Sequence, residues 1–230
     1  MDYLQLDDRQ RYESCQVEAS GEKFSYCKVS YRDVDRYLKI IRHDKTGRGE
    51  QTAIGAVACL GVRNGREVDL FRVALASSWF RRQVVMRLER SWHGFNSLCP
   101  VAERLGRSDY RELSETSCVG VELNPLGRRS DVWVGAFDKL PAEWGQKFGV
   151  VFSNAFDHAF DPWNTAAAWR RILRAGGYLV IQFPTQQTPT SVDPVGLLTL
   201  DDARRFFPGD LVYFRDSGSA WRYTEYVFRM

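Results

Sequence analysis

Residues 58–67 read ACLGVRNGRE and join the end of an apolar run to two closely spaced glycines. The apolar run occupies residues 57–60, Gly61 ends it, and Gly65 follows four positions later. A strand that ends in glycines lets the backbone approach a ligand, because no Cβ atoms stand in the way. The loop 61–65 is therefore predicted to bind a nucleotide-type cofactor in an α/β domain, although Gly-x-x-x-Gly is less specific than the fuller Gly-x-Gly-x-x-Gly motif.

The composition predicts a soluble globular protein of the cytoplasm. The chain has 230 residues, 44% of them hydrophobic, which suffice for a sizeable core. Its net charge of +3 is too small to indicate a dedicated nucleic-acid binder. The five cysteines form no Cys-x-x-Cys pair, so neither a disulfide framework nor a zinc site is expected. The N-terminus is acidic, and no apolar run approaches the ~18 residues of a membrane span.

Two regions are expected along the chain. Residues 1–50 are predicted to form an N-terminal arm followed by a helix over 31–43, which residues 30–33 can begin with a capping box. This helix either covers the mouth of the cofactor site or, as is more common, packs on the edge of the sheet. Residues 51–230 are predicted to form the cofactor-binding domain, with an insertion at about 76–116.

Apolar runs after the glycine loop predict six more strands, at residues 118–123, 132–135, 149–153, 178–183, 211–215 and 223–228. Helices are expected after Gly65, over 165–175 with Gly176 and Gly177 as a C-cap, and over about 200–207. The last two strands, separated by DSGSAW, indicate a hairpin. The predicted fold class is α/β: a Rossmann-like, seven-stranded, mostly parallel sheet with helices on both faces and a C-terminal antiparallel hairpin.

Two acidic residues stand beside the expected cofactor loop. Glu122 lies at the end of the second strand, where an acidic side chain in Rossmann-like units accepts hydrogen bonds from ribose hydroxyls. Glu67 follows the glycine loop. Either it pairs with a positive charge such as an amine, or it stabilises the helix dipole as a first-turn glutamate. Both interpretations of Glu67 stay open.

The insertion contains WFRRQVVMRLER at residues 79–90, which predicts a helix with apolar residues on one side and arginines on the other. Such a helix can meet phosphates or an acidic substrate, but arginines on a solvated face are more common. The same two interpretations hold for His93 in the following loop.

The blocks LGVRNG, VGVELNP, VGAFDKLP, GVVFSNAFDHAFDP and RAGGYLVIQF resemble, in this order, the class I S-adenosylmethionine-dependent methyltransferases. The resemblance covers about residues 54–229 apart from the insertion, and it implies S-adenosylmethionine as the cofactor. The segment RILRAGGYLV resembles the Leu-x-Pro-Gly-Gly turn of the small-molecule branch, and SNAFDH with this turn is similar to methyltransferases of plants and algal viruses. Relatives in large viruses are associated with glycan methylation, which implies O-methylation of a sugar or another small hydroxyl acceptor.

The resemblance also implies which residues bind the cofactor. Gly61, Arg63, Asn64 and Gly65 match the glycine loop beneath its methionine part, and Glu122 matches the ribose-binding acid. Arg63 stands where many relatives have a small residue, so we expect it to close over the carboxylate of the cofactor.

Further cofactor positions match the loops after the second, third and fourth strands. Phe137 and Asp138 lie in the loop that frames the adenine, and Ser153 and Asn154 lie where the backbone faces the methionyl amine and the reaction centre. Because the loop lacks the usual Asp after its glycine, Asp138 or a backbone N–H is left to read the adenine amine. Asn124, which directly follows the second strand, is also assigned to the cofactor site.

The candidate catalytic residues are His158 and Asp157, which follow the fourth strand where acceptor atoms arrive. Methyl transfer to a hydroxyl needs an aligned oxygen and a group that takes its proton. A histidine beside a carboxylate can serve as that base, with Asp157 orienting it or contacting the acceptor. The structural alternative is that His158 caps the following turn. No metal is expected, because Asp157, His158 and Asp161 do not form a recognised ligand signature.

Alternative functions remain open at this stage. The chain could be an RNA or protein methyltransferase that docks its substrate on the arginine helix, or a catalytically inactive cofactor-binding module that serves in interactions. A nicotinamide-dependent oxidoreductase is disfavoured by the missing third glycine and the C-terminal hairpin. The expected partner is a small-molecule or glycan acceptor, with neither nucleic acid nor a membrane, and the sequence predicts no oligomeric state.

Overall fold

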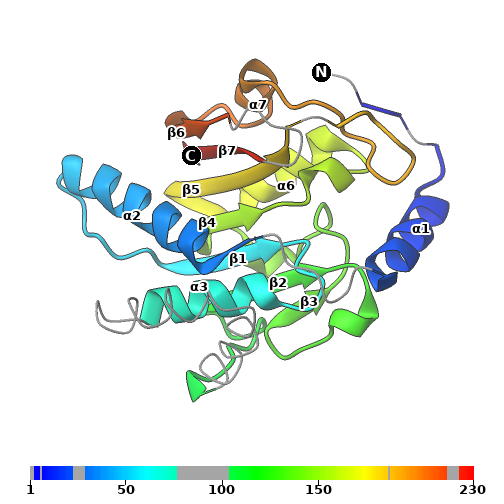
Figure 1. The fold of residues 1–230 in the computed structure, drawn as a ribbon. Coiled ribbons are helices and arrows are strands. Elements are labelled where there is room, and N and C mark those ends of the chain that lie inside the picture. Colours follow the sequence, from blue (N-terminus) through cyan, green and yellow to red (C-terminus); the bar gives the residue numbers. More distant parts are fainter. Residues whose placement is uncertain (1–2, 6, 23–28, 77–103, 186, 217–222) are drawn as a thin grey trace.

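A seven-stranded sheet in the order β3-β2-β1-β4-β5-β7-β6 organises the fold (Figure 1). The computed structural model describes residues 3–5, 7–22, 29–76, 104–185, 187–216 and 223–230. The strands are β1 (Ala56–Leu60), β2 (Cys118–Glu122), β3 (Val132–Val134), β4 (Phe148–Ser153), β5 (Leu173–Pro184), β6 (Asp210–Arg215) and β7 (Tyr223–Arg229). The predicted fold class, including its antiparallel C-terminal hairpin, is confirmed.

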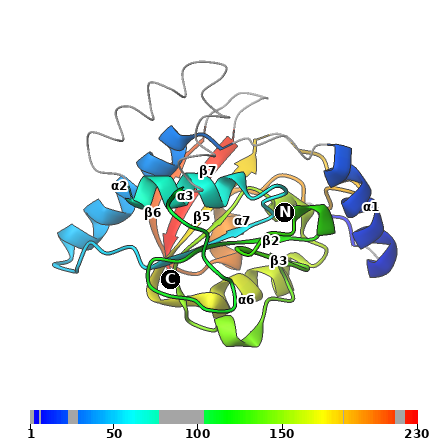
Figure 2. The same ribbon diagram turned by 90° about the horizontal axis from the view of Figure 1, so that it is seen from below.

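Helices cover both faces of this sheet (Figure 2). The α-helices are α1 (Arg9–Glu22), α2 (Tyr31–Gly47), α3 (Arg66–Ala76), α6 (Pro162–Ile172) and α7 (Leu200–Phe206), and the short 3-10 helices are η1 (Pro125–Gly127), η2 (Ala142–Trp144) and η3 (Phe156–His158). The core on one face includes α2 and α3, and the core on the other includes α6 and α7. No helix among the described residues has both the length and the apolar character that crossing a membrane requires.

The parallel register of β1 places the functional loops. Leu60 at its end pairs with Val121 of β2 on one side and with Ser153 of β4 on the other. β4 in turn pairs in parallel with β5, so the carboxyl ends of these four strands meet at one edge of the sheet. Because ligands of open α/β sheets bind at that edge, the register determines which loops can form a site.

The boundary between α6 and β5 differs from the sequence prediction. Asp161 begins α6 by accepting the backbone N–H groups of Trp163 and Asn164. The helix ends at Ile172, and the chain passes directly into β5, so the predicted C-cap by Gly176 and Gly177 is wrong. Both glycines lie within the long β5 strand, where Gly176 has φ +71° and donates its N–H to the oxygen of the C-terminal residue.

The N-terminal region also differs from expectation. A helix, α1, occupies much of the predicted arm and lies beside the carboxyl edge of the sheet, apart from both helical layers (Figures 1 and 2). The helix predicted over 31–43 is present as α2, and Ser30 and Asp33 form the expected capping box. α2 packs against the sheet and α3 rather than over the cofactor site. The arginine-rich segment 79–90, His93 and most of the hairpin turn fall outside the described residues.

A buried ionic network joins α3 to β3 and to the glycine loop. Arg72 contacts Asp69 at 2.8 Å and also binds Asp131, which is fully buried. Arg129 contacts the same two carboxylates at 2.7 and 2.9 Å and donates a 3.1 Å hydrogen bond to the backbone oxygen of Asn64. Each carboxylate is thus shared by two arginines, which keeps the buried charges compensated.

Replacing Asp131 tests this network. Asp131→Ala leaves two largely buried arginines with one shared carboxylate, Asp69, in place of two, and we expect the free energy of unfolding to fall by about 3 kcal/mol. Urea denaturation measures the change. Asp201→Ala is the control: its side chain is 85% exposed, and the expected effect is within about 0.5 kcal/mol. Equal midpoints for both variants would contradict a stabilising role of the network.

Candidate functional site

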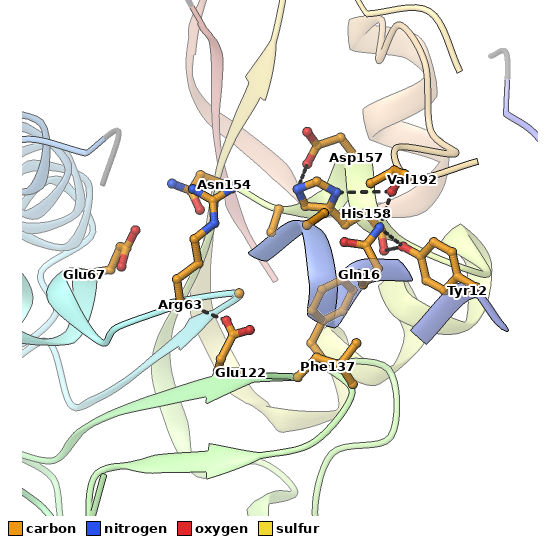
Figure 3. A pocket seen from close by; sticks show the side chains of 14 residues that line it. Tyr12, Gln16, Arg63, Glu67, Glu122, Phe137, Asn154, Asp157, His158 and Val192 are labelled. Atoms are coloured by element: carbon orange, nitrogen blue, oxygen red, sulfur yellow. Dashed lines mark hydrogen bonds and ion pairs between the residues drawn. The ribbon is translucent and has the colours of Figure 1, made fainter. Parts of the chain in front are cut away.

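The pocket at the carboxyl edge gathers residues from α1 and from the loops after β1 to β5. The space inside it is about 90 Å³. Figure 3 shows Asp157 and His158 at one end and Glu122 and Phe137 at the other, with Arg63 between them. The pocket therefore brings together several of the residues that the sequence assigned to the cofactor and to catalysis.

The glycine loop has three residues with positive φ. Gly61 has φ +81°, and a Cβ there would overlap the Cβ of Ala155. Gly65 has φ +76° and faces the guanidinium of Arg129. Arg63 also has a positive φ, of 47°, which is uncommon for a residue with a side chain and marks a position held by its surroundings.

Glu122 holds the loops after β1 and β2 together. Its carboxylate accepts the backbone N–H of Arg63 at 2.6 Å and that of Asn124 at 2.9 Å. The residue is only 4% exposed and lines the pocket. Burial raises the pKa of Glu122 above its ordinary value, while the two N–H groups and Arg63 act in the opposite direction.

The other predicted cofactor residues divide into two groups. Glu67, Phe137 and Asn154 line the pocket, and Glu67 also lies in the first turn of α3, so its position agrees with both interpretations. Asn64 and Gly65 belong to the glycine loop 61–65, but they are not among the described residues that line the pocket.

The remaining three predicted cofactor residues make structural contacts. The side-chain oxygen of Asn124 caps η1, and its side-chain nitrogen donates to the backbone oxygen of Val17 at 3.0 Å. The Ser153 hydroxyl donates to the backbone oxygen of Leu60 and accepts from a backbone N–H. Asp138 is bound through both carboxylate oxygens by Arg9 of α1, at 2.7 Å each. All three are buried and hold neighbouring segments in place, and they are not among the described residues that line the pocket.

His158 lies between two carboxylates. Its Nδ1 is 2.6 Å from Oδ1 of Asp193, on the loop after β5, and its Nε2 is 3.9 Å from Oδ1 of Asp157. The backbone oxygen of Val192 lies 3.4 Å from Nδ1. Burial by itself would lower the pKa of His158, but the two carboxylates and this oxygen outweigh it and raise the pKa above its ordinary value.

Sequence reasoning missed four residues around His158, namely Tyr12 and Gln16 of α1 and Val192 and Asp193 of the loop after β5. The α1 sequence RQRYESCQVEASGE has no apolar stripe, and the loop has no periodicity, so neither segment carried a pattern. Tyr12 and Gln16 are four positions apart, which places both side chains on one face of a helix. This spacing is a sequence feature that could have indicated a shared contact.

The carboxylates beside His158 also have to be considered as metal ligands. Asp157, His158 and Asp193 each offer one donor atom, and these atoms lie within 4.8 Å of one another. Asp161 of the sequence hypothesis is not among them, because it caps α6. Since Asp193 is already at hydrogen-bonding distance from Nδ1, the group has the geometry of an ion-paired histidine.

A larger cavity, of about 1270 Å³, lies at the amino ends of β1 and β2. Its basic residues include Lys45, Arg72 and Arg174, and each of them forms an ion pair. Because open α/β sheets bind ligands at the carboxyl ends of their strands, the smaller pocket is the candidate site.

Comparison with known proteins gives a likeness of fold. No protein-family model and no curated protein matches the chain. A solved structure of 1,6-didemethyltoxoflavin-N1-methyltransferase from Burkholderia thailandensis, with bound 1,6-didemethyltoxoflavin and S-adenosylhomocysteine, is 12% identical, with a TM-score of 0.58 over 97% of this chain and 91% of that chain. The fold is that of S-adenosylmethionine-dependent methyltransferases. A further similar structure, a SAM-dependent methyltransferase from Thermotoga maritima, is 12% identical over 96% and 98% of the two chains, with a TM-score of 0.47.

The charge around His158 can be tested directly. Asp193→Asn removes a carboxylate that raises the pKa of His158, so His158 is expected to lose its proton at lower pH than in the wild type. Imidazole NMR signals followed across pH measure this, with the His158 signals identified by their loss in His158→Gln. Asp201→Asn, a change on an exposed aspartate of α7, is the control. Titration of His158 at or above the wild-type pH in Asp193→Asn would contradict the ion pair.

Proposed function

We propose that the chain is an S-adenosylmethionine-dependent methyltransferase that methylates a hydroxyl of a small acceptor, with sugars as the leading substrate class. The observation that carries the proposal is one pocket, at the carboxyl edge of a methyltransferase fold, that contains both a buried acid at the end of β2 and an ion-paired histidine after β4. Glu122 and His158 are these two residues. The bound S-adenosylhomocysteine in the Burkholderia protein of similar fold supports the cofactor assignment.

The residues of the pocket fit this cofactor. Glu122 would accept the ribose hydroxyls, and Phe137 offers an apolar wall for the adenine. Gly61 lines the pocket with backbone alone, and Arg63 supplies a cation for the methionine carboxylate. We propose residues 51–230 as the cofactor-binding domain, with the N-terminal region contributing α1 to the pocket.

When bound, S-adenosylmethionine supplies an activated methyl group on its sulfonium. The chain then has to orient an acceptor hydroxyl and hold the proton that this hydroxyl releases. His158 is the candidate base, and it must be neutral to accept a proton. Because Asp157 and Asp193 raise its pKa, the neutral form becomes dominant at higher pH than for an ordinary histidine, and it is a stronger base when it does.

The polar groups near His158 support the proposed acceptor class. Oδ1 of Asp157 is buried and has no hydrogen-bond partner within the described part of the chain. A buried acceptor of this kind is satisfied when a ligand donates a hydrogen bond, as a sugar hydroxyl does. Glu67, Glu122 and Asp157 also line the pocket, and these carboxylates would oppose an anionic acceptor.

Cofactor binding is tested by calorimetric titration with S-adenosylmethionine and S-adenosylhomocysteine, with NAD as the negative control. Glu122→Gln exchanges a charged acceptor for a neutral amide, so the expected loss of affinity is about tenfold or more. Glu143→Gln changes an exposed glutamate outside the pocket and should bind as the wild type does. The cofactor assignment fails if the folded wild-type protein binds neither compound.

The role of His158 is tested by kinetics with sugar acceptors. His158→Gln should lower kcat by about 10²–10⁴-fold while the affinity for S-adenosylhomocysteine is retained. In the wild type, kcat should fall as the pH drops below the raised pKa of His158, because the protonated imidazole cannot act as a base. A His158→Gln enzyme with wild-type kcat would assign His158 to a structural role.

A further inference from the structure

Two polar side chains of α1 contact both loops that carry the His158 ion pair. The Tyr12 hydroxyl donates to the backbone oxygen of His158, and the Tyr12 ring packs 5.4 Å from Phe160. The Gln16 amide donates to the backbone oxygen of Val192 and, at 2.9 Å, to the Tyr12 hydroxyl. Figure 3 shows both side chains beside His158.

These contacts lie on either side of the ion pair. One holds the carbonyl of His158 itself, and the other holds the residue directly before Asp193, whose carboxylate lies 2.6 Å from Nδ1. Because Gln16 also binds Tyr12, the two anchors are linked to each other. A 3.1 Å backbone hydrogen bond from Val195 to Asp157 joins the two loops directly, and the contacts of α1 hold them together on the side of His158 and Asp193.

α1 also covers the pocket. A space of about 90 Å³ remains beneath it, whereas sites for drug-sized ligands usually span roughly 300–1,000 Å³. The elements that line this space therefore have to rearrange to admit S-adenosylmethionine. Away from His158, α1 is held by the bidentate pair of Arg9 with Asp138 and by the 3.0 Å hydrogen bond from Asn124 to Val17.

We propose that Tyr12 and Gln16 are positioning residues, and that seating α1 over the pocket brings His158 and Asp193 together. The inference rests on the proposed function for the role of His158, but the geometry on which it stands concerns the ion pair itself. The groups that face His158 are Asp157, Asp193, Glu122 at the end of β2 and Tyr12 on α1.

The titration of His158 tests the positioning role in protein without cofactor and with EDTA present, so that no cation replaces the proton. The chain has three histidines, and His158→Gln identifies the signals. In Tyr12→Phe and in Gln16→Ala, His158 should titrate about half a pH unit or more below the wild type, which corresponds to the loss of one hydrogen bond. Gln10→Ala, on the exposed side of α1, should leave it unchanged.

A double variant separates positioning from a general disturbance. If Gln16 acts through Asp193, then Gln16→Ala should cause no further shift in an Asp193→Asn background. Full additivity of the two shifts would overturn the proposal, as would a wild-type titration of His158 in both folded single variants. Amide NMR spectra establish that each variant is folded.

The variant Arg9→Ala tests whether the position of the whole of α1 affects the titration of His158. Arg9 binds Asp138 rather than His158. Removing a cation would by itself raise the pKa of a histidine, whereas loosening α1 should lower it. A lower titration in Arg9→Ala, with no change in Arg11→Ala on the exposed side of α1, supports the seating mechanism. An unchanged or higher titration in Arg9→Ala contradicts it.

The same experiments distinguish failure of the proposed function from failure of the positioning role. If S-adenosylhomocysteine does not bind, the methyltransferase assignment is lost, but the histidine shifts still decide whether α1 positions the pair. If it binds and the shifts are absent, the assignment stands and the positioning role is wrong. If it binds and the shifts are found, kcat should fall in Gln16→Ala more than the affinity for S-adenosylhomocysteine does.

Discussion

The parallel pairing of β1 with β2 on one side and β4 on the other is the constraint on which the site depends. It aligns Leu60 with Val121 and Ser153, so the loops that follow three separate strands begin at the same edge. Glu122 then joins two of these loops through the backbone N–H groups of Arg63 and Asn124. Without this register the glycine loop, the buried acid and the histidine could not share one pocket.

The fold could be predicted because its elements carry local patterns. Short apolar runs predicted all seven strands, and the capping box at Ser30 predicted the start of α2. The predicted C-cap at Gly176 and Gly177 is wrong for a physical reason, because a glycine pair is common both at helix ends and at bends in strands. Here Leu173 already pairs with β4, and both glycines form backbone hydrogen bonds with Met230.

The candidate site was only partly visible in the sequence. Gly61 follows β1, Glu122 ends β2 and His158 lies in the loop after β4, so their positions could be inferred from the order of the elements. Arg9, by contrast, meets Asp138 across 129 positions, and α1 is held at the pocket by polar contacts rather than by an apolar stripe. Periodicity reports burial of apolar faces and is silent on such contacts, which is why α1 and Asp193 were missed. A segment attached in this way can also detach at lower cost than a core helix.

The placement of the cofactor is tested most directly by a crystal structure of the chain grown with S-adenosylhomocysteine. We expect the ligand at the carboxyl edge of the sheet, with its ribose hydroxyls on Glu122 and its amino-acid end at the loop of Gly61. A ligand bound in the larger cavity at the amino ends of β1 and β2, or a pocket that stays closed without ligand at saturating concentration, would contradict the account.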